Sequence, residues 1–195
     1  QHLAARGTKT ENRYEIMVGL AENYCAKEKL RDGREVTIRA LKSQDKQILV
    51  EGMHHLSPTS LYYRFLMPKR ELTDQELAYF TEVDYFHHMA LLASVGENGV
   101  FVHAGIGRYI MPNNTEASKR AELAFAIIEE YQGMGIATLL LKHLTKLAKE
   151  SGIKEFTALI IPDNIKMLHV FRHSNLLMKT SHGNPGTLEI TLQIP

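Results

Sequence analysis

The segment over residues 121–151 constrains the fold of this chain more than any other part of its sequence. It opens with an apolar run of strand length that carries one charge, Glu122, which is typical of a buried strand. A turn containing Gly133 and Gly135 follows. Beyond the turn, apolar residues recur at steps of three and four until Gly152 stops the pattern, as one face of a helix requires. The segment therefore predicts a buried strand, a glycine turn and an amphipathic helix.

The glycine turn is a candidate anion site. It places unpaired backbone N–H groups at the start of a helix, where phosphate can bind, and a glycine lets the backbone come close because it has no Cβ. The same two glycines would equally serve a tight strand-to-helix turn without any ligand. Because neither G-x-x-x-x-G-K-[ST] nor G-x-G-x-x-G occurs here, the sequence favours neither an ATPase nor a dinucleotide enzyme.

The rest of the chain predicts one domain preceded by a helical extension. For 195 residues one domain is the default expectation, and we assign residues 1–34 to an N-terminal helical appendage and residues 35–195 to the domain. Thr73, three residues before Glu76, fits a capping box. The expected elements are a helix over 14–30, a strand over 35–40, helices within 43–83, a hairpin over 89–110 with its turn at 96–99, a strand over 154–161, a short helix after Asn164 and a last strand over 188–194.

Charge and composition argue against several classes of partner. Lys and Arg total 23 against 22 for Asp and Glu, so no large net field would draw the chain to nucleic acid or anionic lipid. No stretch approaches the roughly 18 apolar residues of a membrane span, and residues 1–13 lack the apolar core of a signal peptide. The single cysteine, Cys25, cannot form an internal disulfide. We therefore expect a cytoplasmic protein that binds neither nucleic acid nor membrane.

The ten histidines do not have the spacing of a metal site. Neighbours such as His54 and His55, or His87 and His88, would point to opposite faces of a strand. The sequence contains no H-E-x-x-H and no zinc-type spacing of cysteine and histidine. We expect no metal.

Residues 132–137 carry a resemblance to a known family. Their sequence, Gln-Gly-Met-Gly-Ile-Ala, matches the Q/R-x-x-G-x-G/A signature of the GCN5-related N-acetyltransferases, the GNAT superfamily. Asn164 also stands where that family has an Asn opening its next helix. Residues 56–65, 83–91 and 121–125 further resemble the acetyltransferase domain of bacterial Pat-type protein-lysine acetyltransferases, and the likeness covers roughly residues 36–178.

The resemblance implies an α/β (α+β) fold of the GNAT type. Such a fold has a central mixed, mostly antiparallel twisted sheet that is flanked by helices and splayed between its fourth and fifth strands. It also implies acetyl-CoA as co-substrate, with the pantetheine arm on the backbone at the end of the strand and the pyrophosphate on the amides of the glycine turn. The implied cofactor-binding residues are Ile127, Ile128, Glu129, Gln132, Gly133, Met134, Gly135, Ile136, Ala137, Thr138, Asn164 and Met167. For Asn164 a helix N-cap is an equally good interpretation, and the two roles are compatible.

Glu122 is the candidate catalytic residue. Acetyl transfer to an amine needs a proton acceptor, and burial of a lone carboxylate in an apolar strand would raise its proton affinity. By its residues alone, Glu122 could equally face solvent or pair with a cation such as Arg120. Resemblance to the Pat-type enzymes, which use a Glu at this place as general base, favours the catalytic interpretation.

The general acid is not identified by the sequence. Many members of the family place a tyrosine seven residues after the Asn, but here that position is Phe171. Tyr131, Tyr109 and His169 are substitutes by guess only. The resemblance also puts Asp84 and His88 at the entrance for the acceptor, although surface or hairpin roles suit either residue.

The sequence therefore predicts an acyltransferase that moves an acetyl group from acetyl-CoA to an amine, most simply a protein lysine. A small-molecule amine is the alternative acceptor, and a non-catalytic acyl-CoA-binding sensor is the alternative function. The acceptor would be selected by residues 43–83 and a loop over 179–186. The sequence leaves open the oligomeric state, monomer or homodimer, and whether a regulatory domain precedes Gln1.

Overall fold

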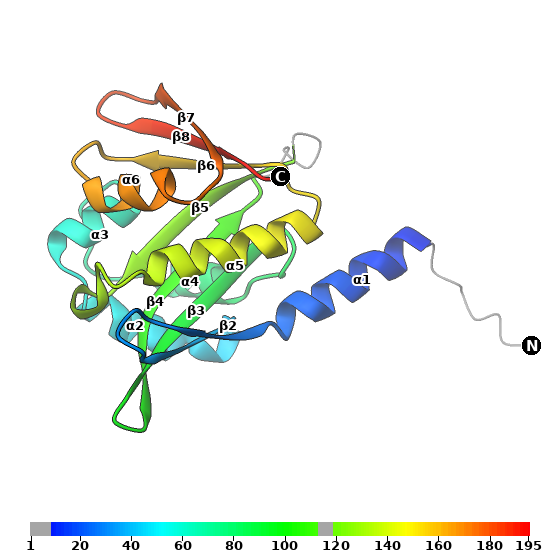
Figure 1. Cartoon of the computed structure of the whole chain (residues 1–195), viewed down its shortest axis with the longest axis horizontal. Helices are drawn as coiled ribbons and strands as arrows, with labels where there is room; N and C mark the ends of the chain where they lie inside the picture. The colour runs from blue at the N-terminus through cyan, green and yellow to red at the C-terminus, as the bar shows by residue number, and fades with distance from the viewer. Residues whose placement is uncertain (1–8, 113–118) are drawn as a thin grey trace, which may run out of the picture.

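The computed structural model describes residues 9–112 and 119–195 (Figure 1). The helices are α1 (Lys9–Glu22), α2 (Lys46–His54), α3 (Pro58–Phe65), α4 (Asp74–Thr81), α5 (Ile136–Glu150) and α6 (Ile165–Arg172), with short 3-10 turns η1 (Ser43–Asp45) and η2 (Glu129–Tyr131). The strands are β1 (Cys25–Lys29), β2 (Glu35–Ala40), β3 (His88–Glu97), β4 (Val100–Ile110), β5 (Arg120–Ile127), β6 (Glu155–Ile160), β7 (Leu177–His182) and β8 (Leu188–Gln193).

The strands form one sheet of eight in the order β1-β2-β3-β4-β5-β6-β8-β7. Neighbouring strands are antiparallel except β5 and β6, which are parallel. These two pair only from Arg120 with Glu155 to Glu122 with Thr157, whereas β5 continues to Ile127. The sheet is therefore splayed beyond Glu122. This confirms the expected GNAT fold class, and β5 and β6 are the predicted fourth and fifth strands, because β1 was not predicted.

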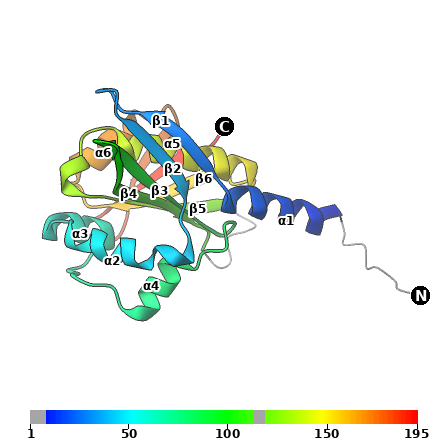
Figure 2. The ribbon, with the colours of Figure 1, turned by 90° about the horizontal axis from the view of Figure 1, so that it is seen from below.

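Helices cover both faces of the sheet. Helices α5 and α6 lie on one face and α2, α3 and α4 on the other, while α1 extends away from the body (Figures 1 and 2). Side chains at alternate positions of β3, β4 and β5 therefore point into two separate layers. The larger core lies beneath α5 and α6, and a smaller one formed by Leu41, Leu49, Ala90 and Leu92 lies beneath α2 and α4.

Helix α5 packs closely on the sheet because its apolar stripe meets a glycine. Its buried residues are Ile136, Leu140, Leu141, His143, Leu144, Leu147 and Ala148, and a fully buried leucine side chain stabilises by about 1.5–3 kcal/mol. A Cβ on Gly107 of β4 would lie 3.2 Å from the Cβ of Leu140, closer than side chains normally pack. The glycine thus brings the helix against β4 and fixes where its N-terminus lies.

Several local predictions are confirmed. Strand β2 has the predicted bounds, and Thr73 and Glu76 form the capping box of α4. The β3–β4 hairpin turns at Asn98 and Gly99, both with positive φ, as tight hairpin turns require.

No described helix is long and apolar enough to cross a membrane.

Two element predictions are wrong. The helix predicted over 14–30 ends at Glu22, and β1 pairs with β2 instead, so the β1–β2 hairpin crosses the boundary placed between residues 34 and 35. The loop predicted over 179–186 begins with the second half of β7, which pairs with β8. In both strands the side chains are mostly polar, so pairing with a neighbour, which the local pattern does not encode, decides the structure. The sequence Met-Pro-Asn-Asn over residues 111–114 also predicts a break after the second strand of the hairpin, and residues 113 and 114 lie outside the described residues.

Candidate functional site

The glycine turn lies open to solvent at the start of α5. Gly133 and Gly135 have φ of 76° and 89°, a region that residues with a Cβ rarely occupy, and a Cβ added to either would meet no atom within 4 Å. The first N–H groups of a helix have no intrahelical acceptor, and the helix dipole favours negative charge there. The predicted anion site therefore has the required geometry.

Gln132 holds this turn in place. Its Nε2 donates to the carbonyl oxygen of Ile127 at 2.9 Å and to Oγ of Ser60 at 3.1 Å, and its Oε1 accepts from Nζ of Lys166 at 3.1 Å. Glu129 adds a second connection by accepting from the N–H of Ser57 at 2.8 Å. The turn is thus joined to β5, to α3 and to α6.

The opposite side of the turn is fixed by Arg34 and Glu97, two residues that the sequence did not single out. Oη of Tyr131 donates to Glu97 at 2.9 Å. Arg34 forms ion pairs with Glu97 and Asp32, and its Nη2 lies 3.3 Å from Sδ of Met134. Burial, and then the bond to Glu97, raises the pKa of Tyr131. These contacts join the two hairpin turns to the loop, and no local pattern around Arg34 or Glu97 signals them.

The splay leaves one edge of β5 accessible. Beyond Glu122, the residues of β5 as far as Ile127 have no register partner on β6. Their backbone groups, apart from the carbonyl oxygen of Ile127, which accepts from Gln132, are suited to pair with an amide-containing chain running between the two strands. The N–H of Ile128 is already used, because it donates to the carbonyl oxygen of Ala104 at 3.0 Å.

Glu122 lies at the point where β5 and β6 part, on the sheet face covered by α2, α3 and α4. It stands opposite Ile110 on one side and Thr157 on the other. The expectation that it is buried is wrong: its side chain is exposed, because alternation along β5 turns only Ala121, Leu123 and Phe125 into the core. Arg120 does not neutralise it, since Arg120 pairs with Glu155 at 2.7 Å.

Comparison with known proteins decides the family. A sequence profile described as the acetyltransferase (GNAT) family matches residues 53–174. The chain belongs to the GNAT family. Like the other members, it is an acetyl-CoA-dependent N-acetyltransferase, and the open turn, the unpaired amides of α5 and the free edge of β5 fit that co-substrate. No three potential metal-binding side chains lie together within residues 9–112 and 119–195.

The similar proteins include an acetyltransferase of Pseudomonas aeruginosa and two Pat proteins. The chain is 33% identical over 128 residues to an acetyltransferase of Pseudomonas aeruginosa, covering 66% of this chain and 67% of that protein. It is 29% identical over 138 residues to the acetyltransferase Pat of Mycolicibacterium smegmatis, covering 71% of this chain and 40% of Pat. The GNAT domain of S. lividans PAT superposes with a TM-score of 0.77 at 30% identity, covering 87% of this chain and 96% of that one.

In this GNAT enzyme Asn164 is the N-cap of α6. Its Oδ1 accepts from the N–H of Met167 at 3.3 Å, and this bond caps the start of α6 beside the splay. Phe171, where many members have a tyrosine, is 1% exposed and packs against Phe125 with ring centroids 6.3 Å apart. No phenol from α6 reaches the splay.

Two of the guessed acids do not suit the role. Tyr109 is buried against Phe156 in the layer beneath α5, and its position next to Arg108 on β4 puts it on the opposite sheet face from Glu122. Burial raises its pKa strongly. His169 is exposed on α6 and stacks on His173, with ring centroids 4.0 Å apart. Tyr131 lies nearer the glycine turn, but its hydroxyl is bound to Glu97.

Asp84 and His88 both have structural partners. Asp84 accepts from the backbone N–H groups of Phe86, His87 and His88 at 2.8–3.0 Å, and these bonds outweigh burial and lower its pKa. His88 is buried and accepts from Nη1 of Arg108 at 2.9 Å. The proposal that they line the acceptor entrance therefore gains no direct support.

Proposed function

We propose that this GNAT enzyme transfers the acetyl group to lysine side chains of proteins, with Glu122 as the general base. The observation that carries the proposal is the position of Glu122, on the sheet face opposite α5 and where β5 parts from β6. Similarity to Pat over residues 56–65, 83–91 and 121–125 supports a protein acceptor.

Each part of the site has a separate task. Bound acetyl-CoA supplies the acetyl group as a thioester. The N–H groups at the start of α5 hold the pyrophosphate, and the free edge of β5 orients the pantetheine arm by backbone hydrogen bonds. The carboxylate of Glu122 accepts the proton that the acceptor ammonium must lose before its nitrogen can attack. Phe171 has no proton to give to the departing sulfur, so that proton comes from water or from another group.

Glu122→Gln tests the role of the base. The substitution keeps the shape of the side chain but removes the proton acceptor, so we expect turnover to fall by roughly 10²–10⁴-fold, with the Kd for acetyl-CoA nearly unchanged. Thiol release measures turnover, and calorimetry measures binding. Glu150→Gln, at an exposed site near the other end of α5, is the matched control. Full activity of E122Q would remove Glu122 from the mechanism.

A panel of acceptors tests the substrate class. We expect turnover with lysine-containing peptides and with whole protein substrates such as an acetyl-CoA synthetase, and little with polyamines. Turnover confined to polyamines would replace the protein acceptor with a small amine. Binding of acetyl-CoA without turnover on any acceptor would leave a sensor module.

A further inference from the structure

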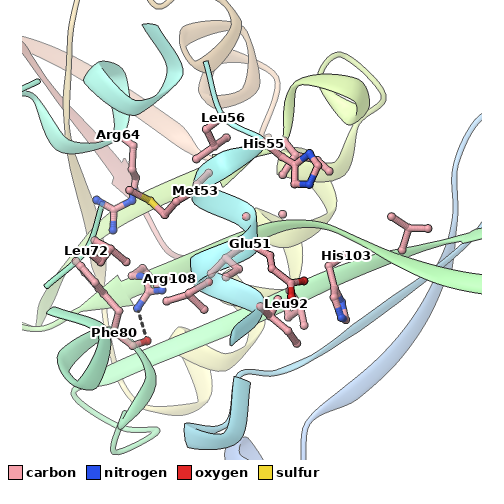
Figure 3. Close-up of a pocket in the computed structure, with 18 of the residues that line it drawn as sticks. Glu51, Met53, His55, Leu56, Arg64, Leu72, Phe80, Leu92, His103 and Arg108 are labelled. Atoms are coloured by element: carbon pink, nitrogen blue, oxygen red, sulfur yellow. Dashed lines mark hydrogen bonds between the residues drawn. The ribbon is translucent and has the colours of Figure 1, made fainter. Parts of the chain in front are cut away.

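A cavity of about 240 Å³ lies between helices α2, α3 and α4 and the sheet (Figure 3). Most of its wall is apolar, including Leu49, Met53, Leu72, Phe80, Leu92 and Ile106. Arg64 and Arg108 lie at the same end of the cavity, and Glu51 and His103 lie toward the other end. The cavity thus combines an apolar body with one cationic end.

Arg108 is a buried charge without a counter-ion. Its side chain extends from β4 and the residue is 4% exposed. Nη1 donates to the carbonyl oxygen of Phe80 and to Nε2 of His88, both at 2.9 Å. No described carboxylate lies within ion-pair distance of its guanidinium, and its other N–H groups meet no acceptor among the described residues. A buried, uncompensated charge is costly, so this arrangement needs an explanation.

Arg64 adds a second positive charge at the same place. Its guanidinium carbon lies 5.4 Å from the ring centroid of Phe80, and that of Arg108 lies 4.8 Å from the same centroid. Burial lowers the pKa of Arg64 to about 10, and burial together with the charge of Arg64 lowers that of Arg108 to about 9. Glu122 raises the pKa of Arg64 against the effect of burial, but no ion pair joins these two described residues.

No described carboxylate forms an ion pair with either arginine, and Glu122 acts on Arg64 without contact. Burial, and then Arg108, lowers the pKa of His88 to about 3, so the imidazole is neutral at physiological pH. The carbonyl oxygen and the aromatic faces provide only partial charge. Two guanidinium groups at one end of an apolar cavity suit a carboxylate in charge, and arginine can bind a carboxylate through paired N–H groups.

We propose that this cavity binds a small carboxylate with an apolar body, its anionic end held by Arg108 and Arg64. The register places Arg108 opposite Ala124, two residues from Glu122, so the site adjoins the place where we propose that acetyl transfer occurs. The carboxylate belongs either to a free apolar acid or to the acceptor amine itself. The proposal goes beyond acetyl transfer, because it rests on the cavity and can be tested without turnover.

Direct binding tests the cavity. Hexanoate and its neutral counterpart hexanamide would be titrated into the full chain and followed by NMR. We expect hexanoate to bind the wild type and to lose at least tenfold in affinity in Arg108→Gln and Arg64→Gln, whereas the weak binding of hexanamide stays the same. Arg70→Gln, exposed between α3 and α4, is the control and should bind hexanoate like the wild type. Circular dichroism checks that each variant is folded, and R64Q, at a residue less buried than Arg108, keeps the test available if R108Q does not fold.

The binding and acetylation experiments distinguish the two sources of the carboxylate, and they can overturn the proposal. If the acceptor carries the carboxylate, leucine is acetylated, 3-methylbutylamine is not, and R108Q abolishes the difference. If a free acid is the ligand, hexanoate binds but leucine is not acetylated. Absence of hexanoate binding, or equal binding by wild type, R108Q and R64Q, overturns the proposal. Because binding is read without acetyl-CoA, failure of the proposed lysine acetylation leaves this result unaffected.

Discussion

His88 and Arg108 share a hydrogen bond in which the imidazole must stay neutral. Nε2 of His88 accepts from Arg108, and a proton on that nitrogen would remove the acceptor and place two positive charges in contact. Burial, followed by Arg108, lowers the pKa of His88 from 6.5 to about 3. In the unfolded chain the same histidine binds a proton near pH 6.5. Between about pH 3 and 6.5 the unfolded state therefore binds more protons, and the free energy of unfolding decreases as the pH falls.

Replacement of His88 by Gln tests this pH dependence. The amide oxygen of Gln can accept from Arg108 but does not titrate, so the loss of stability from pH 6.5 to 4.5 should be shallower than in the wild type. Urea unfolding at a series of pH values measures it. His54→Gln, at an exposed position, should leave the slope as it is. The same slope in H88Q as in wild type would mean that His88 titrates normally in the folded state.

The sequence predicted the roles of residues that depend only on their local backbone conformation. Gly135 needs a positive φ, and Asn164 and Thr73 cap helices that begin immediately after them, so their neighbours in sequence carry the signal. Glu122 shows the limit. Its place on β5 was predictable, but its exposure depends on where helices far away in the sequence end. For the same reason Arg108 was not singled out.

At the scale of elements, Asn164 at the start of α6 has two proposed roles, as the cap of the helix and as a contact of the pantetheine arm. Asn164→Ser retains a hydroxyl that can cap the helix but shortens the side chain and removes the amide. We expect stability to fall by only a few tenths of a kcal/mol, while the Kd for acetyl-CoA rises if the amide contacts the pantetheine arm. Asn164→Ala would lose about 1 kcal/mol as well. An unchanged Kd for N164S would restrict Asn164 to the cap.

The strand, turn and helix around Gly135 can be tested by adding one methyl group. Gly135→Ala must keep a φ of 89°, which costs an L-residue about 1–2 kcal/mol, or must move the first N–H groups of α5. Either result should weaken acetyl-CoA binding. Gly19→Ala, in α1 and without a positive φ, is the matched control and should leave binding unchanged. Thermal unfolding and calorimetry measure the two effects, and undiminished affinity in G135A would place the pyrophosphate elsewhere.

Periodicity predicted the elements that bury an apolar face and failed for those that do not. Helix α5 and strand β2 show clear stripes. Strands β1 and β7 are the two edge strands of the sheet, and their side chains are mostly exposed. Their structure comes from hydrogen bonds to one neighbour, and a hydrogen-bonded backbone leaves little trace in residue type.

At the scale of the whole molecule, side-chain hydrogen bonds join β1 to α5, the helix that covers one face of the sheet. Glu28 accepts from Nε2 of His143 and from Nζ of Lys142, both at 2.8 Å, and Tyr24 is hydrogen-bonded to Nδ1 of His143. In the sheet β1 pairs only with β2. This small network therefore attaches β1 to α5, in addition to the pairing of β1 with β2.

Removing His143 should release β1 without unfolding the domain. His143→Ala deletes both hydrogen bonds of a buried ring, and we expect a loss of about 1–3 kcal/mol together with faster amide hydrogen exchange in residues 25–29. Lys149→Ala, exposed on the same helix, should change neither. Exchange that rises evenly across β3, β4 and β5 as well would contradict the idea of a separately opening edge.

The parting of β5 from β6 also has a consequence for the lifetime of the protein. Unpaired backbone N–H and C=O groups of β5 are left in the middle of the sheet. Other polypeptide chains can pair with them and aggregate, as they do at an outer edge of a sheet. A ligand that occupies this gap in the folded chain alone stabilises folding by mass action, by about 2.7 kcal/mol at a hundredfold excess over its Kd. The concentration of acetyl-CoA would thus govern the lifetime of the folded protein as well as the rate of its reaction.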